Sequence, residues 1–294
     1  MLRRLGLAAL ALATGCKLPT DRFEPTSDGG AAQGSGYDGN LDAGAARRCP
    51  TIAFAPARSI FRGAASAIAV GNIDTDSPDD IAVVSPGAGS AAGTLTLLHN
   101  THGGTFSASG GLDGIGSDPR AVAIADLNHD GNRDIAVANY DDSTRTVQVF
   151  LSSPSSVGGF RASTSYPTRG NPSAIAVGDL FPTTGVDLAV TDENAGGFIS
   201  VLVNNGSGGF GGVMPRQDIA TEPEGTPRAI AAGNFDGGPL DLAVANHKTS
   251  TLNVLLGQGN GSYQLLPSVT LPETQPTSIA VADVDRDQRS DRLP

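Results

Sequence analysis

Residues 126–134 read Asp-Leu-Asn-His-Asp-Gly-Asn-Arg-Asp, and this loop decides how the rest of the chain is interpreted. Oxygen-bearing side chains stand at loop positions 1, 3, 5 and 9, which are Asp126, Asn128, Asp130 and Asp134. Ca2+ takes about six to eight oxygen ligands, and alternate residues of a tight loop direct several oxygens inward. Gly131 permits the sharp turn, and Asn132 adds a backbone carbonyl at position 7. The spacing therefore predicts a Ca2+ site.

The flanks of this loop indicate strands. The loop resembles the start of an EF-hand, but Val137 stands at position 12, where an EF-hand needs Glu. Residues 121–125 before the loop and 135–138 after it are short apolar runs without helical periodicity. We therefore expect a strand–loop–strand unit.

The same frame recurs along the chain. An apolar run, an acidic loop and a D-I/L-A-V segment appear four times, and a fifth copy begins near the end. The runs start at Ile68, Val122, Ile175, Ile230 and Ile279, with spacings of 54, 53, 55 and 49 residues. A period near 50 with several strands per unit is typical of propeller blades. The predicted fold is an all-β propeller of four-stranded blades, with four full repeats and a partial fifth.

Composition agrees with this fold class. The chain has 294 residues, of which 39 are Gly and 19 Pro, and aromatic residues make up only 5%. Turn-rich chains with many short apolar runs are usually all-β. The formal net charge of −11 argues against nucleic acid and anionic membrane surfaces as partners.

The second unit predicts four strands, at 121–125, 134–139, 146–151 and 160–166. In the third of these, Val147 and Val149 alternate with Gln148 and Phe150, which predicts a half-buried strand. A Gly-containing turn precedes each fourth strand and delivers an aromatic residue: Phe106, Phe160, Phe210 or Tyr263.

These motifs resemble the FG-GAP/VCBS repeats. The apolar-Ala-apolar run, the D-x-D/N-x-D-G-x-x-D loop, the D-I/L-A-V strand and the Gly-Phe turn carry the resemblance over about residues 64–291. It implies a β-propeller like the heads of integrin α-chains and many bacterial surface proteins, with Ca2+ as the metal and adhesion or ligand binding as the function. The repeat domain is expected to span residues 51–294, with 51–62 as an outer strand.

The chain departs from the family in its number of blades. The family usually closes with about seven blades, whereas the fifth unit here ends at Asp291–Pro294, where a D-I/L-A-V strand would run. This favours a truncated end. An open arc, a small degenerate propeller and pairing with another chain all stay open.

The other loops differ in their ligands. The first and fifth loops are also predicted to bind Ca2+, through Asn72, Asp74, Asp76 and Asp80, and through Asp283, Asp285, Asp287 and Asp291. The fourth loop is one residue short. The third has Phe181 and Thr183 in place of ligands and is predicted to be a metal-free turn. The alternative for every loop is an Asx-turn, in which Asp and Asn bond local amides. Aligned acids repel one another without a cation, which favours metal in the first two loops.

The N-terminus predicts a lipoprotein. Residues 1–15 have a charged start and an apolar stretch too short to span a bilayer, which indicates a signal peptide. The following Ala13-Thr-Gly-Cys16 resembles a bacterial lipobox, which implies cleavage before Cys16 and lipid on that residue. Residues 16–50 are rich in Gly, Ala and Asp and are expected to form a flexible tether. We assign no role to Cys49.

Short catalytic motifs are missing. The chain has no G-x-S-x-G elbow, no Walker A loop and no zinc-binding His pair, and Gly206–Gly211 matches G-x-G-x-x-G only within a turn. The sequence therefore predicts that the chain is not an enzyme. The predicted function is a lipid-anchored, Ca2+-binding module for binding or adhesion at the bacterial cell envelope.

The expected partner is a protein or glycan, and the only membrane contact is the lipid at Cys16. The expected location is the cell envelope, with the lipid anchor in the outer membrane and the domain in the periplasm or exposed at the surface. Two alternatives remain: a polysaccharide-active enzyme with a carboxylate or His site near the propeller axis, and a truncated, non-functional fragment.

Overall fold

The computed structural model describes residues 59–74, 76, 78–89, 91–102, 104–140, 145–153, 159–182, 185–194, 196–211, 216–272, 275–283 and 291–292. Residues 60–294 form a unit of their own, to which all the elements named below belong. The predicted signal peptide, the tether, Cys16, Cys49 and residues 51–58 lie outside the described residues.

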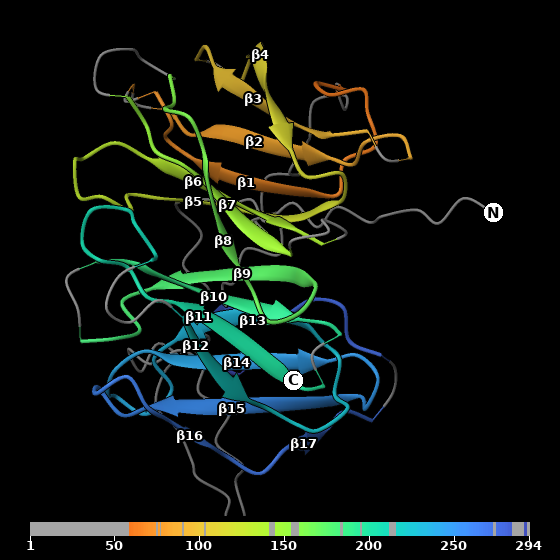
Figure 1. The fold of residues 1–294 in the computed structure, drawn as a ribbon, viewed down its shortest axis with the longest axis vertical. Coiled ribbons are helices and arrows are strands. Elements are labelled where there is room, and N and C mark those ends of the chain that lie inside the picture. Colours follow the sequence, from red (N-terminus) through yellow and green to blue (C-terminus); the bar gives the residue numbers. More distant parts are fainter. Residues whose placement is uncertain are drawn as a thin grey trace, which may run out of the picture. The chain divides into compact units, whose positions relative to one another are not determined.

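Antiparallel sheets follow one another in chain order (Figure 1). The first contains β1 (Ala67–Gly71), β2 (Asp80–Ser85), β3 (Gly93–Asn100) and β4 (Phe106–Ile115). The second contains β5 (Pro119–Ala125), β6 (Asp134–Asn139), β7 (Thr146–Phe150) and β8 (Thr164–Pro167). The third contains β9 (Pro172–Gly178), β10 (Asp187–Asp192), β11 (Phe198–Leu202) and β12 (Arg216–Ala220). The fourth contains β13 (Pro227–Gly233), β14 (Asp241–Asn246), β15 (Thr251–Gly257), β16 (Tyr263–Leu265) and β17 (Val269–Thr270).

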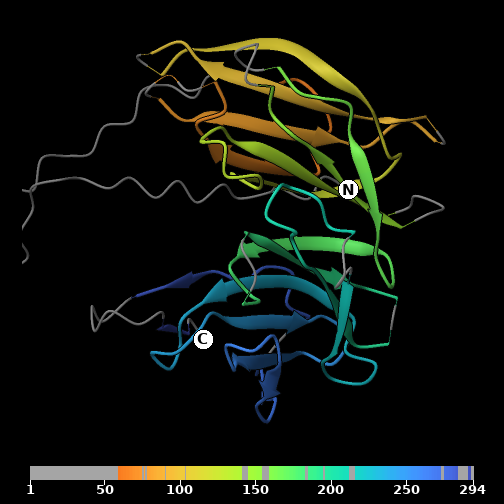
Figure 2. The same cartoon turned by 60° about the vertical axis from the view of Figure 1, so that its left-hand side comes forward.

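The first strand of each sheet lies beside the first strand of the next (Figure 2). β1 contacts β5, β5 contacts β9, β9 contacts β13, and β13 contacts β18 (Val281–Ala282). These are the inner strands of successive propeller blades. Their alanines and glycines allow this close approach, and the fold class predicted from the repeats is confirmed.

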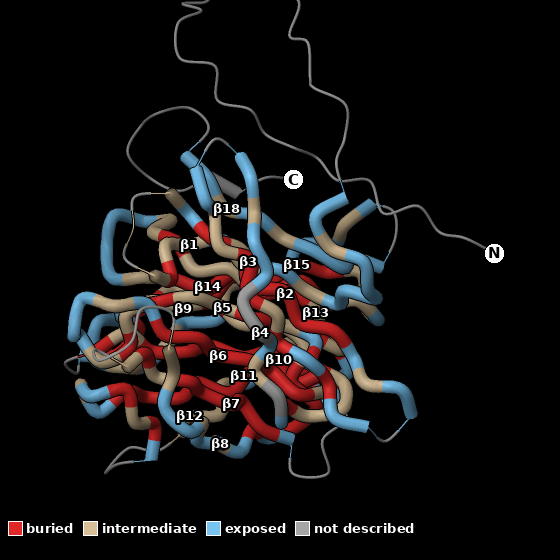
Figure 3. Tube along the Cα trace, turned by 90° about the horizontal axis from the view of Figure 1, so that it is seen from above, coloured by how far each residue is buried: buried red, intermediate tan, exposed pale blue. Residues whose placement is uncertain are grey.

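Three hydrophobic cores fill the spaces between neighbouring blades. The first joins Val84 and Leu97 to Ile135 and Phe150 of the second blade. The second joins residues of blades two and three, and the third joins residues of blades three and four. Because both faces of blades two and three are covered, β6 and β10 are buried along their whole length, and β14 of the fourth blade is buried as well (Figure 3).

The third strand of the second blade corrects a sequence expectation. β7 was predicted to be half-buried, yet all five of its residues are buried. Val147 and Val149 pack in the core toward the third blade, and Phe150 packs in the core toward the first. The side chains of β7 alternate between two hydrophobic cores, whereas the sequence predicted alternation between one core and solvent. The predicted fourth strand is also shorter: Phe160 makes an isolated bridge with Ser152, and β8 begins at Thr164.

The fifth unit repeats the start of a blade. β18 pairs with β19 (Asp291–Arg292), and Ala282 faces Asp291 in the register. In the second blade, Ala125 faces Asp134 in the same way. At the opposite end of the series, Ile68 and Val70 of β1 are 56% and 61% exposed, because no described sheet packs on that side. Residues 59–62, the described part of the expected outer strand 51–62, form no strand. Within the described residues, no helix has the length and apolarity needed to cross a membrane.

Candidate functional site

The register of each blade separates two sets of polar residues. In the second blade Ala125 pairs with Asp134, so the acidic loop lies where the inner strand ends. Pro119 pairs with Asn139, so the residues around Arg120 and Tyr140 lie where the inner strand begins. The same register recurs in blades three and four. Each inner strand therefore has an acidic loop at one end and a second polar group at the other.

The aspartate at loop position 9 is a buried connector in every full blade. Asp134 is fully buried; its Oδ2 accepts from the Leu127 amide at 2.8 Å and its Oδ1 from the Ser152 amide at 2.7 Å. These bonds tie the acidic loop to the chain after the third strand. Asp80, Asp187 and Asp241 are equally buried and make equivalent main-chain bonds.

In the second loop, the remaining predicted ligands bond to loop amides. Asp126 accepts from the amides of Asp130 (3.2 Å) and Gly131 (3.0 Å). Asn128 Oδ1 also accepts from the Asp130 amide, and Asp130 Oδ1 accepts from the Asn132 amide at 2.8 Å. Each oxygen of Asp126 has a second lone pair beyond these bonds. The structure brings the five predicted residues into one loop; their ligation of Ca2+ stays a prediction.

The pKa values of two carboxylates in this loop are shifted in opposite directions. Burial raises the pKa of Asp134, and its main-chain hydrogen bonds offset this only in part. At Asp130, burial also acts to raise the pKa, but hydrogen bonds from Asn132 and Asn128 outweigh it, so the pKa is lowered. Asp130 is therefore the more readily ionised of the two.

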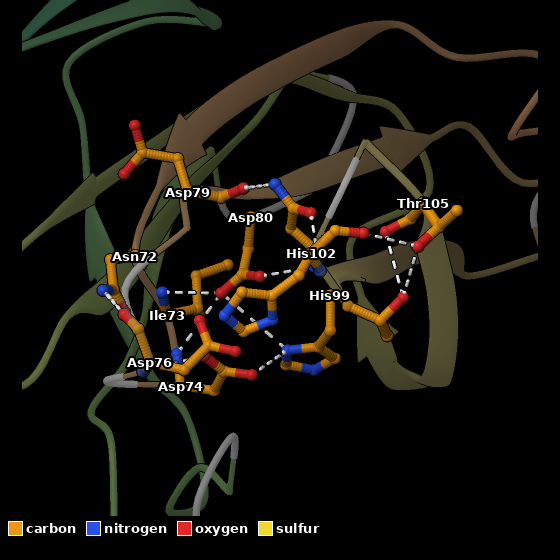
Figure 4. A network of polar contacts seen from close by, with 11 residues as sticks. Asn72, Ile73, Asp74, Asp76, Asp79, Asp80, His99, His102 and Thr105 are labelled. Carbon is orange, nitrogen blue, oxygen red and sulfur yellow. Dashed lines mark hydrogen bonds and ion pairs between the residues drawn. The ribbon is translucent and has the colours of Figure 1, made fainter.

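The first loop has a different composition (Figure 4). Asp74 Oδ2 lies 2.9 Å from Nδ1 of His99, a residue of β3, and Asp80 Oδ2 lies 3.8 Å from the same nitrogen. Asn72 donates to the main-chain carbonyl of Asp76. Burial, a hydrogen bond to Asp74 and the charges of Asp74 and Asp80 raise the pKa of Asp76. The four predicted residues, Asn72, Asp74, Asp76 and Asp80, thus lie in one loop. His99 was not among the residues predicted from the sequence.

The other loops are less complete. Phe181 is buried in the third loop, in keeping with a metal-free turn. Asn234 and Asp236 accept from Gly237 and Gly238 amides in the fourth loop, as in Asx-turns. In the fifth loop Asp283 is exposed and Asp291 begins β19, while Asp285 and Asp287 lie outside the described residues.

Outer turns of one blade rest on the loop of the blade before it. Asn204 follows β11, and its Nδ2 donates at 2.7 Å to the carbonyl of Leu127 in the second acidic loop. Tyr263 of β16 donates to the carbonyl of Leu180 in the third loop. Phe210, one of the predicted turn aromatics, is buried edge-on against Tyr166. The second and third acidic loops are thus each held partly by the following blade.

A second polar group lies at the other end of the inner strands. We call it the rim cluster: Arg120, Tyr140, Glu193, Arg228 and His247. Arg120 lies near the start of β5, and its guanidinium carbon is 4.3 Å from the centre of the Tyr140 ring. Arg120 also forms two hydrogen bonds with Asp118, at 2.8 and 2.9 Å. Burial, followed by a hydrogen bond to Glu193, raises the pKa of Tyr140.

The cluster continues across the third and fourth blades. Glu193, after β10, has a side chain only 6% exposed and accepts a 2.6 Å bond from Arg228 Nε near the start of β13. Arg228 Nη1 lies 3.2 Å from His247 Nε2, and His247 Nδ1 lies 3.3 Å from the carbonyl of Pro276. A neutral His247 protonated on Nδ1 satisfies both contacts, since Arg can only donate. Two cations, a carboxylate, a phenol and an imidazole thus form one contact chain across three blades.

Sequence reasoning missed this cluster. Its members are scattered, and no short motif contains two of them. The repeats did contain a signal at two positions. Two residues before each apolar run, the chain has a polar residue: Ser66, Arg120, Ser173, Arg228 and Thr277. Directly after the second strands of blades two, three and four, it has Tyr140, Glu193 and His247. Charged and aromatic residues at repeat positions next to the inner strands could have identified it.

Comparison with protein families identifies the repeat. Residues 72–137, which span the first two acidic loops, match the FG-GAP-like repeat family. The resemblance inferred from the motifs is therefore confirmed for the repeat. No curated protein matches the chain in sequence.

Solved structures of similar fold include two proteins named for lactonases. A Bacteroides uniformis protein named as a candidate 6-phosphogluconolactonase has 15% identity and a TM-score of 0.50, with 74% of this chain and 60% of that chain covered. The periplasmic gluconolactonase of Pseudomonas aeruginosa has 17% identity and a TM-score of 0.50, with 70% and 60% covered. A Lactobacillus plantarum protein has 17% identity and a TM-score of 0.49, with 74% and 58% covered. The chain thus spans about three fifths of the length of these structures, and at such identities the likeness shows the fold alone.

The prediction that the chain is not an enzyme is wrong. It rested on the repeat family and on missing catalytic motifs, whereas two solved structures of this fold are named for lactonases. A propeller gathers site residues from separate blades, so the absence of a local motif excludes no such site.

Proposed function

We propose that the protein is a carbohydrate-acting hydrolase whose site is the rim cluster, with a sugar lactone as its substrate class. The observation that carries the proposal is the unbroken contact chain Arg120–Tyr140–Glu193–Arg228–His247 across three blades. The names of the two lactonase structures supply the choice of lactone. The proposal departs from the adhesion function that the repeat resemblance led us to expect.

The cluster provides the groups that lactone hydrolysis needs. Water adds to the ester carbonyl, the ring C–O bond breaks, and the proton from water goes to the leaving alkoxide. Glu193 is the carboxylate placed to take that proton first, as a general base. Arg120, whose side chain is 44% exposed, is placed to bind the carbonyl oxygen or an anionic substituent of the sugar. Arg228 orients Glu193 through the 2.6 Å bond.

The test is hydrolysis of gluconolactone and of a phosphorylated gluconolactone, followed by acid release, with spontaneous hydrolysis subtracted. We expect Glu193→Gln to lower kcat about 100-fold or more, as for loss of a general base. Arg120→Leu should lower kcat/KM by a comparable factor, and more strongly for the phosphorylated substrate. The matched control is Arg161→Leu, which removes an exposed arginine remote from the cluster and should retain activity.

Two results would overturn parts of the proposal. Wild-type rates equal to the buffer blank on both lactones would exclude lactonase activity. Release of reducing ends from a polysaccharide, abolished by Glu193→Gln, would keep the rim cluster as the site but replace the substrate class.

We also propose that the second acidic loop binds a structural Ca2+ and that lipid on Cys16 anchors the protein in the cell envelope. The oxygen-only donor set of Asp126, Asn128 and Asp130 fits the ligand preference of Ca2+. Metabolic labelling with a fatty acid tests the anchor. Label retained in a Cys16→Ser variant would refute lipidation at this residue.

A further inference from the structure

We infer that the first acidic loop and His99 form a binding site for a divalent transition-metal ion of the Zn2+ class, distinct in chemistry from the second loop. The site combines carboxylates of the loop with an imidazole from β3. Nitrogen ligands favour zinc-like ions, whereas Ca2+ takes oxygen ligands. The inference is independent of the function proposed for the rim cluster.

The geometry suits a small ion. One ligand atom each from Asp74, Asp80 and His99 can be chosen within 4.8 Å of the others. His99 Nδ1 lies 2.9 Å from Asp74 Oδ2 and 3.8 Å from Asp80 Oδ2. Tetrahedral Zn2+ with bonds of about 2.0 Å places its ligands about 3.3 Å apart, and the separation of His99 Nδ1 from Asp74 Oδ2 is close to this spacing. The side chains of His99 and Asp74 are 15% and 14% exposed, which shields the ion while leaving a path for it.

His99 is specific to the first blade. The register pairs Leu98 with Ile81, and the equivalent pairs are Phe150 with Ile135, Leu202 with Leu188, and Leu255 with Leu242. The residue that follows is His99 in the first blade, but Leu151, Val203 and Leu256 in the others. A position that is apolar in three blades thus carries an imidazole beside the acidic loop in one.

A second observation points to a cation in this loop. Asp76 Oδ1 is a buried carboxylate oxygen with no hydrogen-bond partner, and so is the amide oxygen Asn72 Oδ1. Such oxygens are rare in folded proteins and costly without a partner. In Figure 4 the side chains of Asp74, Asp76 and His99 lie together, beside Asp80. A bound cation would offset the repulsion among the carboxylates of Asp74, Asp76 and Asp80, which raises the pKa of Asp76.

The candidate ligands differ in how many of their lone pairs already accept hydrogen bonds. Asp80 Oδ2 accepts from the amides of Ile73 and Asp74, and Asp80 Oδ1 accepts from the Asn100 amide. Asp80 therefore retains one lone pair, on Oδ1, and contributes mainly negative charge. His99 and Asp74 are the principal ligands, and Asp80 completes the group of three.

The experiment is calorimetric titration of the chelator-treated full chain with Zn2+ and, separately, with Ca2+. Cys16→Ser and Cys49→Ser are present in every protein, so that thiolates do not compete for the metal. His99→Leu installs the residue that the second blade has at this position. Since loss of a supporting residue alone typically weakens metal affinity about 10- to 100-fold, loss of His99 should weaken Zn2+ binding about 100-fold or more. When Co2+ is used in place of Zn2+, the visible absorption of the bound ion in wild type should be absent from the His99→Leu variant.

Variants in the second loop, and a second variant at His99, serve as controls for the Zn2+ titration. Asp130→Ala should retain Zn2+ binding and lose Ca2+ binding, and His129→Asn, in the second loop, should leave the Zn2+ titration unchanged. His99→Gln, which keeps an amide donor for Asp74, decides the matter if His99→Leu does not fold. Equal Zn2+ affinity and stoichiometry in wild type and both His99 variants would overturn the site. Binding of Ca2+ at the first loop more tightly than Zn2+ would also overturn it.

Discussion

The main-chain amide of Asn204 donates a 2.8 Å hydrogen bond to Oδ1 of Asp187, in a blade whose loop has Phe181 and Thr183 at positions 3 and 5 in place of metal ligands. Asp187 Oδ2 accepts from the amides of Leu180 and Phe181, both at 3.0 Å. The carboxylate makes these bonds without any acidic neighbour at positions 3 or 5. The ninth position of the repeat therefore has a structural role that does not depend on a cation.

Replacing Asp187 with Ala should destabilise the fold regardless of Ca2+. The change leaves three amides without an acceptor, each of which costs about 1–3 kcal/mol when buried. We expect the free energy of unfolding in urea to fall by about 3 kcal/mol or more, equally in Ca2+ and in EDTA. Asp179→Ala removes the exposed aspartate at position 1 of the same loop and should change stability by less than about 0.5 kcal/mol. A loss for Asp187→Ala seen only in Ca2+ would contradict this role.

Replacing Asp130 with Ala should have the opposite dependence on Ca2+. Asp130 is exposed and bonds only within its loop, so the variant should melt close to wild type in EDTA. In Ca2+ at about 100 times the dissociation constant, wild type should gain about 2.7 kcal/mol, and the variant should lose most of that gain. The measurement is a thermal melt under both conditions. Equal Ca2+ stoichiometry in the two proteins would rule out a ligand role for Asp130.

The contact between blades two and three can be tested at Asn204. Its Nδ2 donates to the carbonyls of Leu127 and Val186, and its Oδ1 accepts from the amides of Gly206 and Gly208. Because all four bonds are lost, Asn204→Ala should lower the free energy of unfolding by about 2–4 kcal/mol.

The adjacent asparagine is the control for this prediction. Asn205 is exposed and bonds only to Ser207 and Gly209 within its own turn, so Asn205→Ala should cost about 1 kcal/mol or less. Urea unfolding of both variants provides the comparison. Equal losses would show that the turn matters and the contact between the blades does not.

Asp192 should make stability depend on pH. Burial raises its pKa from 3.8 to about 6, with Asp218 adding to the effect and a 2.6 Å bond from Ser200 opposing it. The folded state binds the proton more tightly than the unfolded state, so this contribution to stability is complete below pH 3.8. It is lost as pH rises through about 6, and amounts to about 3 kcal/mol in total.

The Asp192→Asn variant isolates this contribution. Its side chain does not titrate, so the difference in unfolding free energy between variant and wild type should shift by about 2.5 kcal/mol in favour of the variant from pH 4 to pH 7.5. Urea titrations at both pH values measure the difference, in which other titrating groups cancel. Parallel pH profiles would show that Asp192 titrates normally.

Much of the fold followed from local pattern. Alternating apolar residues, small residues in the inner strands and turn glycines recur about every 50 residues, and each acts within one blade. The starts of the second strands, Asp80, Asp134, Asp187 and Asp241, were correctly placed because the D-I/L-A-V motif marks them. The burial of β7 was missed because its second covered face comes from another blade.

The sequence by itself determined the repeated four-stranded blade and the convergence of the acidic loop residues, because these depend on neighbours within one strand–loop–strand unit. Only the tertiary structure decided that His99 faces the first loop and that Arg120, Tyr140, Glu193, Arg228 and His247 meet. His99 reaches its loop through the pairing of β2 with β3. The rim cluster forms because packing of successive blades aligns residues roughly one repeat apart, a proximity that no local motif encodes.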